Sequence, residues 1–328
     1  MRFALMIEAQ MGLSYDEQLA IVRTAEAAGF DSFFRSDHYE SFPGPGDQPT
    51  TDAWAVTAGL ARDTTRISLG VLVSPVTFRY PGNFAKVATT VDHMSGGRIE
   101  VGLGAGWNES EHRRYGFDFP DIRERGDRLE EQLAILPGLW TEPDGWTFDG
   151  RHYRVQDALF RPKAVDLPGR PRTASGRVRP RIIVGGGGSP RSMRIATRYA
   201  DEFNLTSSSP EQAREKYAAL DAACETAGRD PATITRSAMI GVMVGADEAE
   251  VASRRAALLA ALDVPADGEG GEWFEERRRR WIMGTPDEAR ATVRRYADAG
   301  VERIMLQDFL PRDLPMIELL GREFVGRV

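Results

Sequence analysis

The amino-acid sequence predicts a (β/α)8 barrel, on three observations. Eight apolar segments with the character of buried strands alternate with helical segments along the 328 residues. Polar and glycine-rich stretches follow the carboxyl ends of several strands, which is where barrels of this class carry their chemistry. A doubly wound open sheet is the alternative, but it would bind a nucleotide at a Gly-x-Gly-x-x-Gly turn, and neither glycine run has that spacing.

The strands and helices are expected in alternation. Residues 3–7 form the first strand, and Ser14 caps a helix to Ala28, with Glu17 completing a capping box. The other strands are expected at residues 30–36, 66–73, 98–103, 182–184, 202–205, 236–244 and 301–306. The other helices are expected at residues 51–62, 81–94, 123–140, 191–199, 210–227 and 314–325, with two or three helical pieces between the last two strands.

The alternation is interrupted between residues 141 and 180. Pro, Gly and Arg are frequent there, and residues 146–155 have the pattern of a short hairpin that turns at Asp149-Gly150. We therefore expect one barrel domain over residues 1–328, with insertions after strands and a hairpin and loop insertion at about 141–180.

The composition limits the classes of partner. The chain has 49 acidic and 42 basic residues and a net charge of -7, which argues against a nucleic-acid surface. No apolar run approaches the roughly 18–20 residues of a membrane span, and the N-terminal apolar run ends at Glu8, too early for a signal peptide. The single Cys224 excludes an internal disulfide and a cysteine-based metal cluster. We expect a cytoplasmic protein that binds neither nucleic acid nor membrane.

The stretch from Phe30 to His38 is the strongest candidate for chemistry. Its aromatic strand ends in Ser36-Asp37-His38, which places an acid and an imidazole at the carboxyl edge of the barrel. His93, His112 and His152 fit structural roles, and the sequence has no His-Glu-x-x-His pattern, so no metal site is expected. His38 is the candidate for proton transfer, and a hydrogen-bonded loop histidine is the alternative.

Two glycine-rich stretches follow strands. In residues 102–108, alternate glycines leave the main chain open to a ligand, or else form a tight strand-to-helix turn, and the residues favour neither interpretation. Gly185 to Gly188 stand between a strand end and a helix start, where free N–H groups and the positive end of the helix meet. For this second stretch we favour a phosphate site over a flexible turn.

Seven blocks, in order over nearly the whole chain, carry a family resemblance. They are Phe33–His38, Leu69–Tyr80, Ser95–Arg98, Val101–Asn108, Phe148–Tyr153, the Gly185 run and Met283–Glu288. Together they resemble the bacterial luciferase-like superfamily. Within it they are most similar to the actinobacterial branch of oxidoreductases that use the deazaflavin coenzyme F420.

The resemblance implies a cofactor across the carboxyl mouth of the barrel and a non-prolyl cis peptide that bulges from the third strand behind the cofactor ring. The cis bond is expected at Leu72-Val73 or at the next bond. The cofactor contacts that the resemblance implies are Asp37 and His38 near the ring, Asn108 holding the cofactor, and Gly187, Gly188 and Thr206 at its phosphate. The resemblance also implies a homodimer.

The chain departs from the sugar-phosphate and alcohol dehydrogenases of this family at two positions. Ala105 stands where they carry a glutamate after Gly-x-Gly, and Phe42 stands where they carry a tryptophan four residues past the histidine. Without that glutamate, the acid that pairs with His38 in dehydrogenation is missing. Reduction of an activated double bond by reduced F420, with His38 assisting proton transfer, is therefore favoured. Phe42 and Trp107 are expected to line an apolar pocket for a small-molecule substrate.

Two other functions stay open. The first is a luciferase-like monooxygenase that uses FMN supplied in reduced form by a partner reductase, since FMN and F420 share a ring system and a phosphate. The second is a non-catalytic barrel that binds a cofactor or a partner protein. The substrate itself is not predicted, because loop detail selects it and the fold does not.

Overall fold

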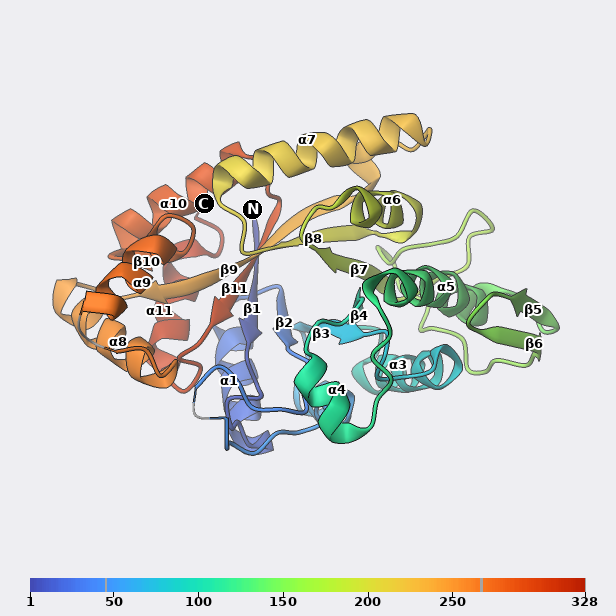
Figure 1. Cartoon of the computed structure of the whole chain (residues 1–328), viewed down its shortest axis with the longest axis horizontal. Coiled ribbons are helices and arrows are strands. Elements are labelled where there is room, and N and C mark those ends of the chain that lie inside the picture. Colours follow the sequence, from blue (N-terminus) through green and yellow to red (C-terminus); the bar gives the residue numbers. More distant parts are fainter. Residues whose placement is uncertain (45, 266–267, 328) are drawn as a thin grey trace.

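Eight parallel strands close into a barrel in the computed structural model, which describes residues 1–44, 46–265 and 268–327 (Figure 1). The strands are β1 (Arg2–Ile7), β2 (Ser32–Arg35), β3 (Ser68–Pro75), β4 (Ile99–Gly104), β7 (Arg181–Gly186), β8 (Glu202–Thr206), β9 (Thr235–Val244) and β11 (Arg303–Asp308). The barrel closes because β11 pairs in parallel with both β9 and β1. The predicted (β/α)8 barrel is confirmed. A short strand that the sequence did not predict, β10 (Ile282–Gly284), pairs with β9 outside the ring of eight.

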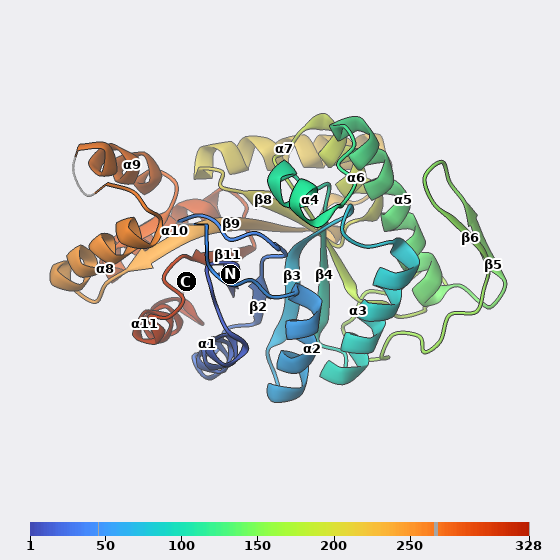
Figure 2. The same cartoon turned by 60° about the horizontal axis from the view of Figure 1, so that its bottom comes forward.

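Helices surround the barrel (Figures 1 and 2). They are α1 (Tyr15–Ala27), α2 (Ala53–Asp63), α3 (Pro81–Ser95), α4 (Glu109–Tyr115), α5 (Ile122–Thr141), α6 (Pro190–Tyr199), α7 (Pro210–Thr226), α8 (Glu248–Ala261), α9 (Gly268–Arg278), α10 (Pro286–Asp298) and α11 (Leu314–Phe324). Ser14 and Glu17 form the expected capping box at the start of α1. None of the helices in the described ranges has the length and apolar character to cross a bilayer.

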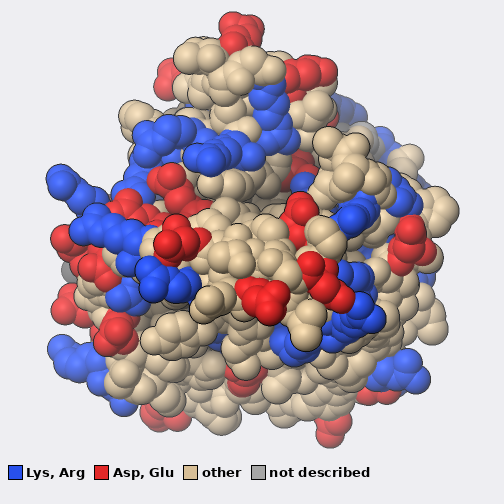
Figure 3. All heavy atoms as spheres, turned by 90° about the vertical axis from the view of Figure 1, so that its right-hand side faces the viewer, with Lys and Arg blue, Asp and Glu red and all other residues tan. Residues whose placement is uncertain are grey.

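The interruption between α5 and β7 contains the expected hairpin, with β5 (Trp146–Asp149) antiparallel to β6 (Arg154–Ala158). Its turn is fixed to α5, because the Glu131 carboxylate accepts hydrogen bonds from the backbone N–H groups of Arg151 at 2.7 Å and Tyr153 at 2.8 Å. The hairpin lies outside α5, away from the barrel axis (Figure 2). On this side of the molecule basic and acidic side chains are mixed (Figure 3). Within the hairpin, Arg154 forms an ion pair with Asp149.

A buried ion cluster fills the amino-terminal end of the barrel. Arg303 of β11 is fully buried, with Nη1 2.7 Å from Glu100 Oε2 and 3.1 Å from Glu202 Oε2, and with Nη2 3.0 Å from Asp31 Oδ2. Burial alone would lower the pKa of Arg303, but the neighbouring carboxylates outweigh it and raise that pKa above its ordinary value. The cluster joins β11, β4 and β8 across the inside of the barrel.

An apolar layer separates this ion cluster from the opposite mouth. It consists of Ala4, Met6, Phe34, Leu72, Ile183 and Met305. The ring of Phe34 occupies the space over Gly70, where a Cβ atom would lie 2.5 Å from Phe34 Cε1. The interior of the barrel is therefore filled by side chains from its amino-terminal end up to this apolar layer. A ligand site is expected at the carboxyl end.

Candidate active site

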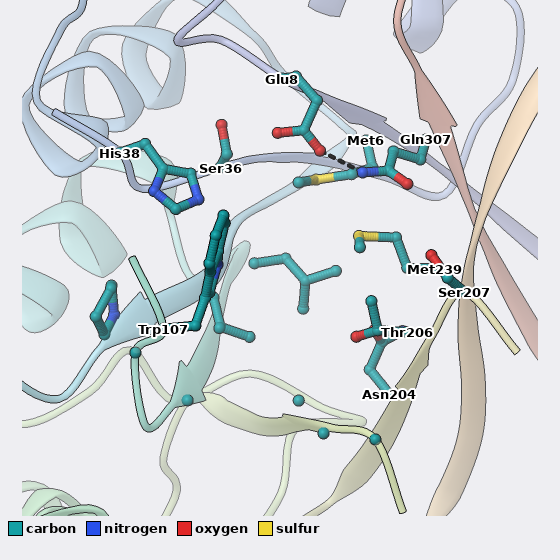
Figure 4. Close-up of a pocket in the computed structure, with 18 of the residues that line it drawn as sticks. Met6, Glu8, Ser36, His38, Trp107, Asn204, Thr206, Ser207, Met239 and Gln307 are labelled. Carbon is teal, nitrogen blue, oxygen red and sulfur yellow. Dashed lines mark hydrogen bonds between the residues drawn. The ribbon is translucent and has the colours of Figure 1, made fainter. Parts of the chain in front are cut away.

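A cavity of about 660 Å³ lies at the carboxyl ends of the strands, within the size range of small-molecule and cofactor sites (Figure 4). Its lining comes from all eight barrel strands and the segments that follow them: Met6, Glu8, Ser36, His38, Phe42, Pro43, Leu72, Val73, Pro75, Gly104 to Trp107, Gly185 to Gly187, Asn204, Thr206, Ser207, Met239, Gln307 and Phe309. Residues that are far apart in the sequence thus meet at one mouth, as the barrel prediction requires. No group of three His, Cys, Asp or Glu side chains suited to a metal ion occurs in the described part of the chain.

His38 lines the cavity directly after β2, and a buried carboxylate orients its ring. Nδ1 of His38 lies 2.9 Å from Oε1 of Glu111, a residue of α4 that is 1% exposed and lies outside the lining. The second oxygen of Glu111 accepts a hydrogen bond from the backbone N–H of Tyr39 at 3.0 Å. Because an ionised carboxylate only accepts, Nδ1 carries a proton in this pair, and Nε2 is the nitrogen that can exchange a proton with a ligand.

The structure gives His38 a carboxylate partner that sequence reasoning did not predict. Glu111 stands in the first turn of α4, whereas the glutamate of the related dehydrogenases would stand at position 105, where this chain has Ala105. Asn108 fixes the start of that helix, since its side chain accepts from the Ser110 N–H at 3.1 Å. The available sequence signal for this partner was an acid, Glu111, three residues after the capping Asn108. Glu111 contacts His38 from outside the cavity and therefore positions the ring without facing a substrate.

Asp37 lies behind the cavity wall. Its Oδ2 is 2.5 Å from Arg79 Nη1, and Arg79 Nη2 lies 2.7 Å from Asp52 Oδ2. Burial would lower the pKa of Arg79, but the Asp37 carboxylate raises it above the ordinary value. Asp37 thus anchors the loop after β2 to the loop after β3. Neither Asp37 nor Asn108, which were expected at the cofactor, belongs to the lining, so their cofactor contacts stay predictions.

The third strand has the expected bulge. The peptide bond Leu72-Val73 is cis, the first of the two bonds expected, and the pairing of β3 with β4 shifts between Val71 and Ser74. Both Leu72 and Val73 line the cavity. A Cβ atom on Gly104 would lie 2.6 Å from Val73 Cγ2, and one on Gly185 would lie 2.8 Å from Val73 Cγ1. These two glycines therefore make room for Val73, a reason that neither sequence interpretation included.

The turn after β7 lines the cavity together with two hydroxyl groups at the end of β8. Gly187, Thr206 and Ser207 all line the cavity, and a Cβ atom on Gly187 would meet nothing within 4 Å. Gly188 lies outside the lining, has φ +85°, and packs on Lys216, whose Cδ would lie 2.9 Å from an added Cβ. The structure thus brings Gly187 and Thr206 together at the cavity and places Gly188 behind them.

Three aromatic rings form one corner of the cavity. The ring centroids of His38 and Phe42 are 4.5 Å apart, those of His38 and Trp107 are 5.7 Å apart, and all three rings meet edge to face. Trp107 is 66% exposed, at the rim. The structure places both Phe42 and Trp107 in the lining, where a substrate pocket was expected.

A second polar group, which sequence reasoning missed, lies across the mouth from the hydroxyls. Glu8 follows β1 and lines the cavity, its Oε2 accepts from Gln10 Nε2 at 2.8 Å, and its Oε1 accepts from Gln307 Nε2. Gln10 Oε1 in turn accepts from the Ser36 hydroxyl. The signal for Glu8 was its position directly after a buried strand, the same criterion that identified His38.

Comparisons with known proteins extend these observations. Residues 1–303 match the family model described as luciferase-like monooxygenase. The F420-dependent glucose-6-phosphate dehydrogenase of Intrasporangium calvum is 31% identical over 306 residues, which cover 86% of this chain and 85% of that protein. F420-dependent glucose-6-phosphate dehydrogenase 1 of Rhodococcus jostii is 31% identical, with 93% of this chain and 91% of that protein covered.

Solved structures share the fold. Monooxygenase RslO1 from Streptomyces bottropensis has a TM-score of 0.80 at 22% identity, with 99% of this chain and 98% of that chain covered. An F420-dependent secondary alcohol dehydrogenase, solved with an F420-acetone adduct, has a TM-score of 0.78 at 19% identity, with 98% of this chain and 97% of that chain covered.

Proposed function

The chain belongs to the luciferase-like monooxygenase family, and we propose that it is an oxidoreductase that uses reduced coenzyme F420 to transfer a hydride to a small organic substrate. His38 supplies the proton that accompanies the hydride. The observation that carries the proposal is a histidine whose Nδ1 is held by buried Glu111 while its ring lines a cavity that also contains an open glycine turn. The relatives named F420-dependent support the choice of cofactor.

The residues present fit such a cofactor. Gly187, Thr206 and Ser207 offer an uncrowded main chain and two hydroxyl groups to its phosphate, as P-loop-like and helix-start sites do. Leu72 and Val73 give an apolar wall for its ring. When bound, reduced F420 supplies the hydride, and the protein supplies orientation and a pocket from which water is excluded. Asp37, Asn108 and Gly188 stay proposed contacts of the same cofactor.

The chain's own residues manage the proton. Glu111 accepts a hydrogen bond from Nδ1 of His38 and so keeps the proton on that nitrogen in place. Nε2 is therefore the nitrogen that holds the proton passed to the substrate. The anchor of Asp37 on Arg79 fixes the loop that carries His38. Phe42 and Trp107 cover one side of the imidazole ring and limit the access of water to it.

A titration of the purified chain with oxidised F420 and, separately, with FMN tests the cofactor. We expect saturable binding of F420 and much weaker binding of FMN. Binding of FMN without binding of F420 would overturn the proposal. The turnover test is oxidation of reduced F420 in the presence of activated alkenes, with His38→Asn as the variant that loses the proton donor.

The FMN-dependent monooxygenase is the second candidate, favoured by the match to the monooxygenase family model over residues 1–303. Substrate-dependent oxygen consumption with reduced FMN would support it. We also propose that a separate reductase supplies the reduced cofactor. The chain is further proposed to form a homodimer, which light scattering of the purified chain checks. If His38→Ala leaves every measured activity unchanged, the result would favour the third function, a non-catalytic barrel that binds a cofactor or a partner protein.

A further inference from the structure

We infer that the substrate of this site is a neutral or cationic compound that directs a hydrogen-bond donor at Glu8, and that it is not a phosphate ester. The inference rests on the proposed function, because it concerns the substrate of the same cavity. The curated relatives, by contrast, are named for glucose 6-phosphate.

The environment of Glu8 carries the inference. Glu8 is 7% exposed, and its carboxylate receives hydrogen bonds from two neutral amide groups, those of Gln10 and Gln307. The Ser36 hydroxyl donates to Gln10 Oε1 and thereby fixes which end of that amide faces Glu8. Glu8 forms no ion pair with a described residue, and no Lys or Arg occurs in the described lining of the cavity. Each carboxylate oxygen can accept about two hydrogen bonds, so acceptor capacity remains for a ligand.

The cavity is also divided by polarity. Figure 4 shows Glu8 at the upper edge of the cavity, with His38 on one side of it and Gln307 on the other. Thr206 lies below them beside Asn204, and Ser207 lies between Gln307 and Thr206. A phosphate fits the end with hydroxyl groups and the glycine turn, which the cofactor takes under the proposed function. The end that remains for the substrate holds a carboxylate. An anionic substrate there would meet a like charge in a partly buried site, where screening by solvent is weak.

The walls around Glu8 fit a flat, largely apolar body. His38, Phe42 and Trp107 form the aromatic corner, and the thioether side chains of Met6 and Met239 lie in the lining as well. The substrate class is therefore a planar, weakly polar molecule with one donor group such as a hydroxyl, an amide N–H or a protonated amine.

A matched set of probes tests this: benzylamine, benzyl alcohol and benzyl phosphate share one ring and differ in charge. Their binding to the chain saturated with oxidised F420 is measured by ligand-observed NMR titration. We expect benzylamine to bind at least about tenfold more tightly than benzyl phosphate, with benzyl alcohol between them, from the charge of Glu8 alone. Glu8→Gln should reduce the preference to less than about threefold. The matched control Glu109→Gln removes the charge of an exposed acid outside the lining and should leave the ranking unchanged.

Equal or tighter binding of benzyl phosphate to the wild-type chain would overturn the inference. If Glu8→Gln does not fold, Gln307→Lys replaces it, because a cation beside Glu8 should also abolish the preference for benzylamine. Failure of the proposed function would be recognised by a different result, the absence of F420 binding. The same ranking is then measured with inorganic phosphate at saturating concentration in place of the cofactor, and the same outcomes decide the inference.

Discussion

The orientation of His38 depends on a single buried carboxylate. A hydrogen bond to a charged group contributes about 1.5–3 kcal/mol, so Glu111→Gln should lower turnover by about 10- to 100-fold. Glu111 lies outside the cavity lining, and we therefore expect the dissociation constant of F420 to change little. Steady-state kinetics and a cofactor titration check the two quantities separately. His38→Asn, which removes the proton donor itself, should cost about 10²- to 10⁴-fold. Wild-type turnover in Glu111→Gln would refute the positioning role.

Asp308, at the end of β11, should make stability depend on pH. Burial raises the pKa of its carboxyl group to about 7, and the Asp313 carboxylate adds to this, against the Leu310 N–H and Arg254. In the unfolded chain the ordinary value is 3.8. Between these two values the folded chain holds the extra proton, so the free energy of unfolding falls as the pH rises from about 4 to about 7 and then levels off.

Asp308→Asn should remove this slope. The amide oxygen can still accept from the Leu310 N–H, as Oδ1 does at 2.7 Å, and the side chain no longer ionises. Above pH 7 the variant should be more stable than the wild type by on the order of a few kcal/mol, and the two should converge at low pH. Urea unfolding of both chains at several pH values is the measurement, and parallel curves would contradict the assignment.

At the scale of single residues, the sequence identified His38 because the strand pattern and the adjacent acid are local signals. It missed the partner, because Glu111 is 73 positions away in the chain and reaches His38 only through the placement of α4. Glu8 was missed although it stands directly after a strand. Its significance depends on Gln10 and Gln307, and no pattern in the sequence brings Gln307 to it.

Among the elements, the turn between β7 and α6 gives a test with an internal control. Gly187 has open space at its Cβ position, whereas Gly188 has φ +85° and packs on Lys216. Gly187→Ala should weaken F420 binding by about tenfold or more, since hydrogen bonds to a charged acceptor are each worth about 1.5–3 kcal/mol, and the melting temperature without ligand should not change.

Gly188→Ala should differ from Gly187→Ala in its effect on stability. Alanine at positive φ costs roughly 1–2 kcal/mol, so the ligand-free chain should melt at a lower temperature. Thermal melting and cofactor titration of both variants separate the two roles. Unchanged F420 binding in Gly187→Ala would mean that the turn does not hold the phosphate.

The elements themselves were predictable because the barrel strands are short segments rich in apolar residues, and such segments are recognised from neighbouring positions alone. The glycines of residues 102–106 show the limit of this reading. Gly104 is required by Val73, a residue of β3, and that contact exists only after two strands are placed side by side. The three-residue strand β10 was missed because so short a segment has no periodicity.

For the whole molecule, the cluster around Arg303 should determine stability without affecting the cavity. Arg303→Met leaves Glu100 and Glu202 buried without their cation, which typically costs about 3–5 kcal/mol. The apolar layer lies between the cluster and the cavity, so F420 affinity should be preserved. Urea unfolding and a cofactor titration check both parts. The control Arg236→Met breaks a partly exposed pair with Asp221 and should cost about 1 kcal/mol or less.

Closure of the barrel could be predicted from the number and alternation of strands, because few folds accommodate eight buried parallel strands with helical connections. The contents of the barrel could not be predicted. Arg303 and Glu100 are separated by 203 positions, and each looks locally like an ordinary charged residue in a strand. Only the closed ring brings them together.

The bulge of β3 limits how deeply a ligand can enter the mouth of the barrel. Val73 fills the spaces over Gly104 and Gly185, so three strands meet in one close-packed step. A flat ligand that rests on this step lies at a height fixed by the volume of one aliphatic side chain. A larger or smaller side chain at position 73 would therefore raise or lower such a ligand relative to His38.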